Sequence, residues 1–234
     1  MASVRLKFHV FVDFDGTIAT IDTTDRLLTR FAEPAWLDIE KQWKSGEIGS
    51  RECMERQIGL IRATPDELDA FINEIEIDPA FPAFVGFCRK QGFGTTVVSD
   101  GIDRTIERVL ARAGLNLPFR ANHIEWLGSD RWRLGFPYSR EACPAAAGHC
   151  KCGSLGDAGS VVRIAIGDGR SDFCMAEKAD LVLAKGVLAE HCRSTDLRHL
   201  PFNDFTEATA LLIDWLETAY GSRAGLPKLE TEHA

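Results

Sequence analysis

The sequence predicts an α/β protein in which a doubly wound, mostly parallel sheet carries a small helical cap inserted after its first strand. Short apolar runs that end in acidic or small polar residues recur along the chain, as expected of buried parallel strands. Segments with apolar residues at helical spacing separate these runs. The block from Asp22 to Ile77 shows helical spacing alone. Alternating strands and helices indicate the sheet, and the all-helical block indicates the insertion.

The first strand is expected over residues 8–12, a run of apolar, β-branched and aromatic residues. It leads directly into Asp13, and Asp15 follows before Gly16 and Thr17 break the strand. Ligands of open α/β sheets bind at this end of the strands, and side chains at i and i+2 of a strand point to one side. Such a pair favours a division of roles, in which a divalent metal keeps one carboxylate ionised as a nucleophile and the other is a general acid. A loop of calcium-binding or purely turn-forming type is the alternative.

The helical block predicts a domain boundary on each side. Helical spacing is interrupted at residues 33–34, 45–46 and 64–65, and Thr64-Pro65-Asp66-Glu67 is typical of a helix start. An insertion at this point would cover the strand ends and exclude water from the cleft. We therefore assign residues 1–20 and 79–222 to a core domain, residues 21–78 to a helical cap and residues 223–234 to a flexible tail.

A second strand is expected over residues 94–98, and it ends in Ser99-Asp100-Gly101. A helix is expected to start at once, at Ile102, so its N-terminal N–H groups and the Ser99 hydroxyl would face one ligand. The alternative for Ser99 is a simple helix cap. Residues 119–137 alternate like two strands, with a turn at residues 128–130.

Three cysteines and a histidine lie close together at Cys143, His149, Cys150 and Cys152. This grouping leaves two interpretations open. One is a structural zinc site, and the other is a metal-free loop that positions the Lys151 side chain. The cysteine spacing is not one of the common zinc-finger spacings, which favours the loop.

A further buried strand over residues 161–166 ends in a glycine-rich loop that contains Asp168 and Asp172. The glycines allow the backbone to bend closely around a bound ion. Mg²⁺ takes few carboxylates directly and keeps several waters, so Asp168 would be a direct ligand and Asp172 a partner of the bound waters or of Lys151. Another strand at residues 180–184 and helices up to residue 220 complete the sheet.

Composition limits the class of partner. The chain has 234 residues, 45% of them hydrophobic, and a net charge of −8, which argues against nucleic acid or an anionic membrane as the main partner. No apolar run approaches the roughly 20 residues of a membrane span, and the start of the chain lacks the pattern of a secretion signal. Seven cysteines, an odd number, are typical of free thiols in a reducing compartment. We expect a cytoplasmic protein, either a monomer or a homodimer, whose partner is a small molecule.

Four motifs in a fixed order resemble those of the haloacid dehalogenase-like (HAD) phosphatases. Asp13-Phe14-Asp15-Gly16-Thr17 matches the first motif, Ser99 the second, Lys151 the third, and Gly-Asp-x-x-x-Asp at residues 167–172 the fourth. The resemblance implies a HAD-like, Rossmann-type core and hydrolysis of a small phosphorylated metabolite through an aspartyl-phosphate.

The resemblance also implies a role for each matched residue. Asp13 would be the nucleophile, Asp15 the general acid and base, and Lys151 the cation that holds Asp13 and the phosphate in register. The phosphoryl group would be bound by Ser99, Asp100 and Gly101. Mg²⁺ would be the cofactor, held by Asp13, Asp15, Asp168 and Asp172.

The cap resembles that of the phosphoserine-phosphatase-like branch, in which an acid nine residues after the nucleophile, here Asp22, binds the substrate amino group. Those enzymes carry a Phe and an Arg where this chain has Ser50 and Gln57. A resemblance over nearly the whole chain is to the methionine-salvage phosphatases that act on 2-hydroxy-3-keto-5-methylthiopentenyl-1-phosphate. The resembling positions include Arg56 and residues 188–205. Arg56 is expected to be the second substrate-binding residue of the cap, after Asp22. Phosphoserine phosphatase and phosphotransferase activities are the alternatives.

Overall fold

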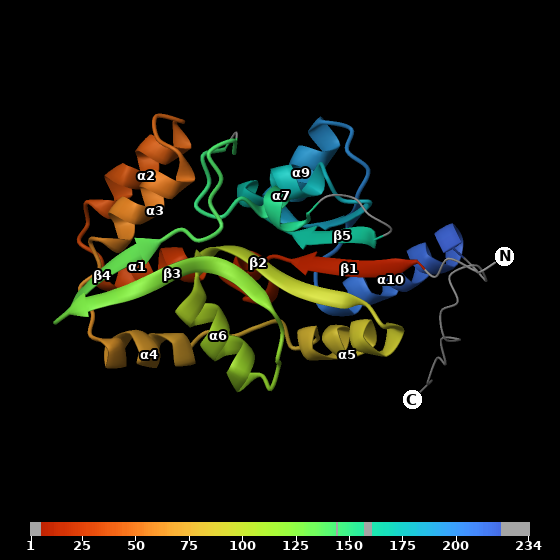
Figure 1. The fold of residues 1–234 in the computed structure, drawn as a ribbon, viewed down its shortest axis with the longest axis horizontal. Coiled ribbons are helices and arrows are strands. Elements are labelled where there is room, and N and C mark those ends of the chain that lie inside the picture. The colour runs from red at the N-terminus through yellow and green to blue at the C-terminus, as the bar shows by residue number, and fades with distance from the viewer. Residues whose placement is uncertain (1–5, 144, 157–160, 221–234) are drawn as a thin grey trace.

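The computed structural model describes residues 6–143, 145–156 and 161–220. They form one seven-stranded sheet in the order β4-β3-β2-β1-β5-β6-β7 (Figure 1). Every neighbouring pair is parallel except β3 and β4. The strands are β1 (Lys7–Val12), β2 (Gly94–Ile102), β3 (Phe119–Gly128), β4 (Arg131–Gly135), β5 (Val161–Gly167), β6 (Leu181–Ala184) and β7 (Leu200–Pro201).

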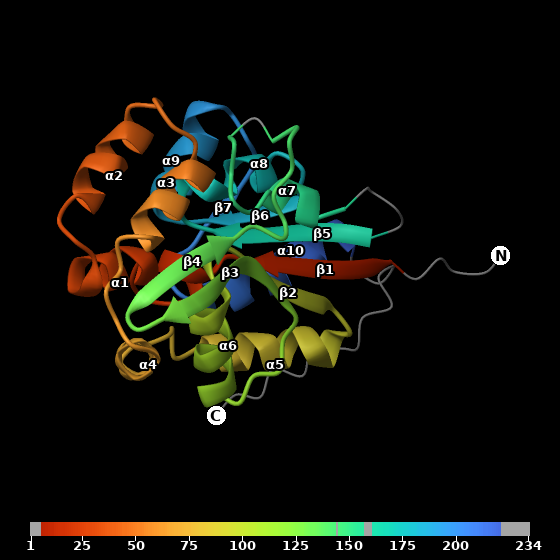
Figure 2. The same ribbon diagram turned by 60° about the vertical axis from the view of Figure 1, so that its left-hand side comes forward.

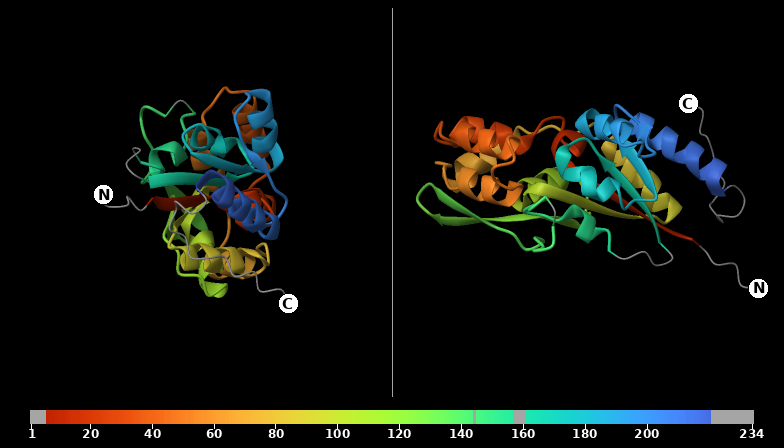
Figure 3. Two further views of the ribbon diagram at one scale, coloured as in Figure 1. Left: turned by 90° about the vertical axis from the view of Figure 1, so that its right-hand side faces the viewer. Right: turned by 90° about the horizontal axis from the view of Figure 1, so that it is seen from above.

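Helices cover both faces of the sheet, as the end-on view in Figure 3 shows. One face carries α5 (Phe81–Gln91), α6 (Asp103–Arg112) and α10 (Phe205–Tyr220), and the other carries α7 (Lys151–Ser154), α8 (Phe173–Ala176) and α9 (Gly186–Ser194). Aromatic contacts of Phe205 with Phe81 and Phe84 join α10 to α5. The predicted doubly wound, mostly parallel α/β fold is confirmed.

Strand β1 lies in the middle of the sheet, and its second half is buried on both faces. Val10 and Val12 are fully buried on one face, and Phe11 is 6% exposed on the other. The chain leaves β1 toward β2 on one side and reaches β5 on the other, so β1 marks the point where the strand order reverses. Ligands of such sheets bind in the crevice outside the carboxyl ends of the strands at this point. Asp13 directly follows β1 and therefore lies at that crevice.

Four helices lie between β1 and β2 in the chain, and we call them the insert: α1 (Thr23–Phe31), α2 (Trp36–Lys44), α3 (Ser50–Ile58) and α4 (Pro65–Asn73). We expected a small bundle, but the helices separate. Helices α2 and α3 pack together on one side of the β3–β4 hairpin, whereas α4 lies on the other side next to α6 (Figure 2). The hairpin thus passes between them, and the Trp132 indole N–H donates to the Ala63 carbonyl at 2.8 Å.

Several predicted boundaries differ from the structure in detail. Strand β2 continues beyond Val98 to Ile102, with a shift in its register against β3 that re-aims Ser99 and Asp100. The short strand β7 lacks an apolar run and was missed. The tail predicted at residues 223–234 lies outside the described residues. Within the ranges that the structure describes, no helix is long and apolar enough to cross a membrane.

Candidate active site

Asp13 stands at the carboxyl end of β1 and is 4% exposed. A tight turn over residues 14–18 follows, and Gly16 in it has a φ of 67°, a conformation that favours glycine. A Cβ atom on Gly16 would collide with the Asp168 carboxylate. The Thr17 hydroxyl donates to the same carboxylate at 2.8 Å. The Gly-Thr pair after the two acids therefore positions Asp168.

Lys151 lies at the start of α7, and its side chain is 1% exposed. Its Nζ lies 2.6 Å from Asp13 Oδ1 and 2.7 Å from Asp172 Oδ1, and it donates to the Ser171 hydroxyl at 2.9 Å. Burial alone would lower the pKa of Lys151, but the two carboxylates outweigh it and raise this pKa. The ammonium group is therefore charged and holds Asp13 in place. Sequence reasoning missed Ser171, although it lies within the fourth motif.

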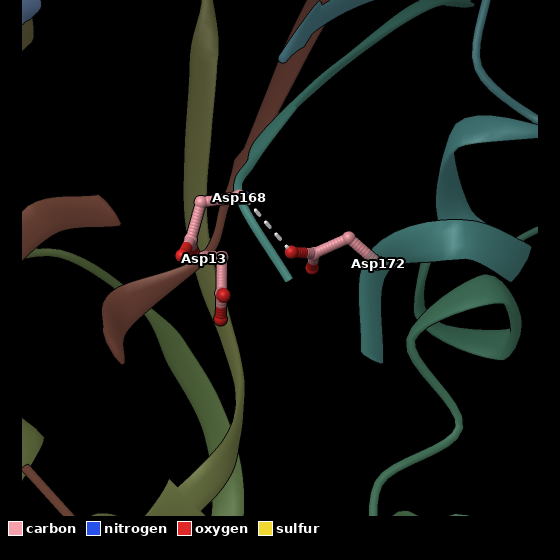
Figure 4. Close-up of side chains that lie close together, drawn as sticks. All are labelled: Asp13, Asp168 and Asp172. Atoms are coloured by element: carbon pink, nitrogen blue, oxygen red, sulfur yellow. Dashed lines mark hydrogen bonds between the residues drawn. The ribbon is translucent and has the colours of Figure 1, made fainter. Parts of the chain in front are cut away.

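The loop after β5 brings two further carboxylates to Asp13. Asp172 is fully buried, and its Oδ2 accepts the backbone N–H groups of Asp168 and Gly169, both at 3.1 Å. A Cβ atom on Gly167 would collide with the Asp172 carboxylate, so the loop can close around it only with glycine there. Figure 4 shows Asp13, Asp168 and Asp172 converging from the end of β1, the end of β5 and the turn that follows β5.

This group of carboxylates fits a divalent cation. One oxygen of each of Asp13, Asp168 and Asp172 lies within 4.8 Å of the others, and no other group of His, Cys, Asp or Glu side chains in the described residues meets that test. Burial raises the pKa of Asp13, with the neighbouring Asp172 adding to it, and burial also raises that of Asp168. Asp13 and Asp172 share the Lys151 ammonium group and the charge of Lys185 also acts on Asp168, so the three carboxylates outnumber these two cations. Oxygen ligands of this kind suit Mg²⁺.

The Asp15 side chain turns away from this group and faces the start of the insert. Its Oδ1 accepts the backbone N–H of Thr23 at 2.8 Å, and its Oδ2 lies 3.3 Å from the Ser99 hydroxyl. Burial, with the nearby Asp22 carboxylate adding to it, raises the pKa of Asp15 to about 7. The structure thus does not bring the Asp15 carboxylate into the group of three, and its side chain suits proton transfer rather than metal binding.

Ser99 is fully buried at the edge of the crevice, close to Asp15. Its hydroxyl oxygen accepts the Gly101 N–H at 2.9 Å. A Cβ atom on Gly101 would lie 2.5 Å from Asp15 Oδ2, so only glycine permits this approach. The Asp100 carboxylate points away from Asp15, toward Ser50, Asn122 and the His149 backbone.

The two insert residues predicted to bind substrate lie in different places. Asp22 caps α1 by accepting the Asp25 N–H at 2.9 Å, and its charge acts on Asp15. Arg56 lies on the outer surface of α3, where it donates to Gln42 at 2.9 Å and pairs with Glu52 at 3.2 Å. The structure brings Asp22 to the edge of the site and leaves Arg56 outside it.

His149 and the cysteines around Lys151 have other partners. The His149 ring bonds the Ser99 carbonyl through Nδ1 at 2.9 Å and the Ser154 hydroxyl through Nε2 at 2.6 Å. Because a carbonyl can only accept, Nδ1 carries the proton, and neither ring nitrogen is left for a metal. Cys143, Cys150 and Cys152 pack with Cys174 in a small buried cluster. These hydrogen bonds and this packing hold in place the segment that carries Lys151.

The family follows from sequence comparison. The haloacid dehalogenase-like hydrolase family matches this chain over residues 10–177, most of its length, and the chain belongs to that family. The match spans Asp13, Ser99, Lys151 and the loop after β5. The expected family is thereby confirmed.

Named relatives are phosphatases. The chain is 31% identical over 212 residues to the 2-hydroxy-3-keto-5-methylthiopentenyl-1-phosphate phosphatase of Brevibacillus brevis, a match that covers 88% of this chain and 95% of the relative. An enzyme of the same name from an Exiguobacterium species is 29% identical, over 88% of this chain and 98% of the relative. The expected enzyme class, a HAD-family phosphatase, is confirmed by these matches.

Solved structures share the fold. A phosphoserine phosphatase from T. onnurineus superposes with a TM-score of 0.66 at 18% identity, over 91% of this chain and 97% of that one. A phosphoserine phosphatase with an analogue of its phospho-aspartyl intermediate gives a TM-score of 0.65 at 20% identity, over 90% of this chain and 99% of that one. These similarities support the core architecture.

Proposed function

We propose that this protein is a Mg²⁺-dependent phosphomonoester phosphatase that works through an aspartyl-phosphate on Asp13. The observation that carries the proposal is the position of Lys151, whose buried ammonium group joins Asp13 to Asp172 beside Asp168. A buried carboxylate held by a cation and flanked by two more acids is arranged for nucleophilic attack on a phosphate.

In the first half-reaction, Asp13 Oδ2 attacks phosphorus, because Oδ1 is occupied by Lys151 and no described residue donates to Oδ2. The bond between phosphorus and the ester oxygen breaks, and the leaving oxygen takes a proton from Asp15. The products are an alcohol and a phosphoryl group on Asp13. The Ser99 hydroxyl and Lys151 would bind the phosphoryl oxygens as charge develops on them.

In the second half-reaction, Asp15 takes a proton from water, and the water oxygen attacks phosphorus. The bond to Asp13 breaks, which releases inorganic phosphate and restores the Asp13 carboxylate and the protonated Asp15. Asp13, Asp168 and Asp172 would hold the Mg²⁺, which when bound supplies positive charge for the phosphoryl oxygens. Asp172 would act largely by orienting Lys151 and the loop after β5.

The substrate that we propose is 2-hydroxy-3-keto-5-methylthiopentenyl-1-phosphate, the compound on which the relatives from Brevibacillus and Exiguobacterium act by name. The matches cover nearly the full length of this chain and of both relatives, which supports assigning the same substrate to this protein. We propose that the insert serves as a cap over this substrate, with residues 21–78 as its limits. Cation–π contact between Arg170, beside Asp172, and Trp43 of α2 at 6.0 Å supports a closed position of the insert over the site. A cytoplasmic location completes the proposal, and the free state of all seven cysteines supports it.

The test is phosphate release from a panel of phosphomonoesters with and without Mg²⁺. The panel holds the methylthiopentenyl phosphate, phosphoserine and an aryl phosphate, and a second series adds alcohols or sugars as acceptors. We expect Mg²⁺-dependent release, fastest from the methylthiopentenyl phosphate. Faster release from phosphoserine would contradict the substrate, and transfer to an added acceptor would identify a phosphotransferase.

A further inference from the structure

The Asp100 carboxylate accepts hydrogen bonds from three segments that are distant in sequence. The Ser50 hydroxyl, at the start of α3 in the insert, donates at 2.7 Å. The Asn122 side chain, on β3, donates at 3.1 Å, and the His149 backbone N–H donates at 2.8 Å. Asp100 itself belongs to β2. One side chain therefore joins the insert to the sheet and to the segment that precedes Lys151.

A second contact joins the start of α3 in the insert to the segment that precedes Lys151. The Arg51 N–H donates to the Ala146 carbonyl at 3.1 Å, and a Cβ atom on Gly49 would lie 2.6 Å from the Ala146 Cβ. The Arg51 guanidinium also lies over the Phe136 ring, 5.1 Å from its centroid. The N-terminal turn of α3 is thus seated directly on Ala146, three residues before His149.

The network continues into the catalytic groups. The His149 ring donates to the carbonyl of Ser99, and Lys151 follows His149 by two residues. Gly148 lies so close that a Cβ atom there would be 2.9 Å from Asp100 Oδ1. A displacement of Asp100 would therefore move the backbone on which both Ser99 and Lys151 depend.

We propose that Asp100 is a positioning residue that couples the seating of the insert to the placement of Lys151, with the Ser50–Asp100 hydrogen bond as the link. When α3 is seated, Ser50 and His149 hold opposite sides of one carboxylate. When α3 lifts away, Asp100 loses its partner from the insert, and the segment over residues 146–149 loses its contacts with Gly49 and Arg51. The positions of Ser99 and Lys151 therefore depend on whether the insert is seated. The consequence for turnover rests on the proposed phosphatase activity, whereas the coupling itself does not.

The coupling is tested without substrate by hydrogen–deuterium exchange of the full-length protein. Ser50→Ala removes the hydroxyl from the insert and touches no catalytic residue. Hydrogen bonds to a charged acceptor are among the stronger ones in proteins, so we expect exchange to rise about tenfold. The rise should occur in two peptides, the one around Arg51 and the one around His149.

Two matched variants separate a specific link from general loosening of the insert. Ser45→Ala makes the same chemical change in the α2–α3 turn, where the hydroxyl bonds only Gln42 and Glu47 among the described residues, and should leave both peptides unchanged. Ser50→Thr keeps a hydroxyl and should restore protection. Faster exchange confined to the Arg51 peptide, no change in either peptide, or the same change in Ser45→Ala would each overturn the coupling.

Gly49→Ala provides an independent perturbation, because its Cβ would push α3 off Ala146 while leaving Ser50 and Asp100 intact. It should raise exchange in the His149 peptide as Ser50→Ala does, and unchanged exchange there would contradict the proposal. In turnover, kcat/KM should fall about tenfold in Ser50→Ala and recover in Ser50→Thr. If the wild type hydrolyses no phosphomonoester, the proposed function fails, and the exchange data still decide the coupling.

Discussion

Replacement of Lys151 by Met removes the ammonium group that, among residues 6–143, 145–156 and 161–220, pairs with the carboxylates of Asp13 and Asp172. At an effective dielectric constant of about 20, each contact at 2.6 and 2.7 Å is worth about 6 kcal/mol of attraction. The cost of burying the ammonium group offsets several kcal/mol of that, and loss of one partner from a buried pair typically destabilises by about 3–5 kcal/mol. We expect Lys151→Met to lower the free energy of unfolding by about 4 kcal/mol.

Urea denaturation followed by circular dichroism measures this loss, with Lys178→Met as the control because Lys178 is exposed on the surface. Added Mg²⁺ should recover more stability in Lys151→Met than in the wild type, since the cation would neutralise the uncompensated carboxylates. Phosphate release should fall at least about a hundredfold. Stability within 1 kcal/mol of the wild type, together with retained activity, would refute the assigned position of Lys151.

Three further outcomes follow from other contacts. Gly16→Ala should raise the Mg²⁺ concentration for half-maximal activity about tenfold, because the new Cβ would displace the Asp168 carboxylate; an unchanged Mg²⁺ titration would contradict this. Burial lowers the pKa of His149 to about 4, so the unfolded state, with a histidine pKa near 6.5, binds the proton more readily. Stability should therefore fall by about 2 kcal/mol between pH 6.5 and 5, and chemical denaturation of His149→Gln should show a smaller fall. Thr64→Ala should cost about 1 kcal/mol in thermal denaturation, through loss of the Thr64–Glu67 capping box at the start of α4, without a change in kcat.

The grouping of the three carboxylates was predictable from the sequence for a simple topological reason. Parallel strands end at one edge of the sheet, so acids that directly follow β1 and β5 must meet there once those strands pair. Asp13 and Asp168 meet in that way, and Asp172 reaches them from the turn that follows β5. Lys151 was found through motif order, since nothing local in a cysteine-rich loop indicates that its side chain is buried.

Contacts that depend on how the insert packs were not predictable. Helical spacing indicates that α1–α4 are helices with apolar faces, but it does not state which neighbour each face meets. Arg56 and Ser50 occupy one helix, yet Arg56 faces solvent and Ser50 faces Asp100. The orientation of Asp15 toward Thr23 depends on the tight turn at Gly16, which breaks the strand alternation that placed both acids on one side.

In the proposed mechanism, Asp13 carries the phosphoryl group during turnover. The most direct measurement is mass spectrometry of enzyme quenched in acid during turnover of its best substrate with Mg²⁺. We expect a phosphoryl adduct on the peptide that contains Asp13. The adduct and the activity should vanish in Asp13→Asn, and both should persist in Asp38→Asn, which alters a surface carboxylate that is 75% exposed. Steady turnover without any adduct on that peptide, or full activity in Asp13→Asn, would contradict an aspartyl-phosphate on Asp13.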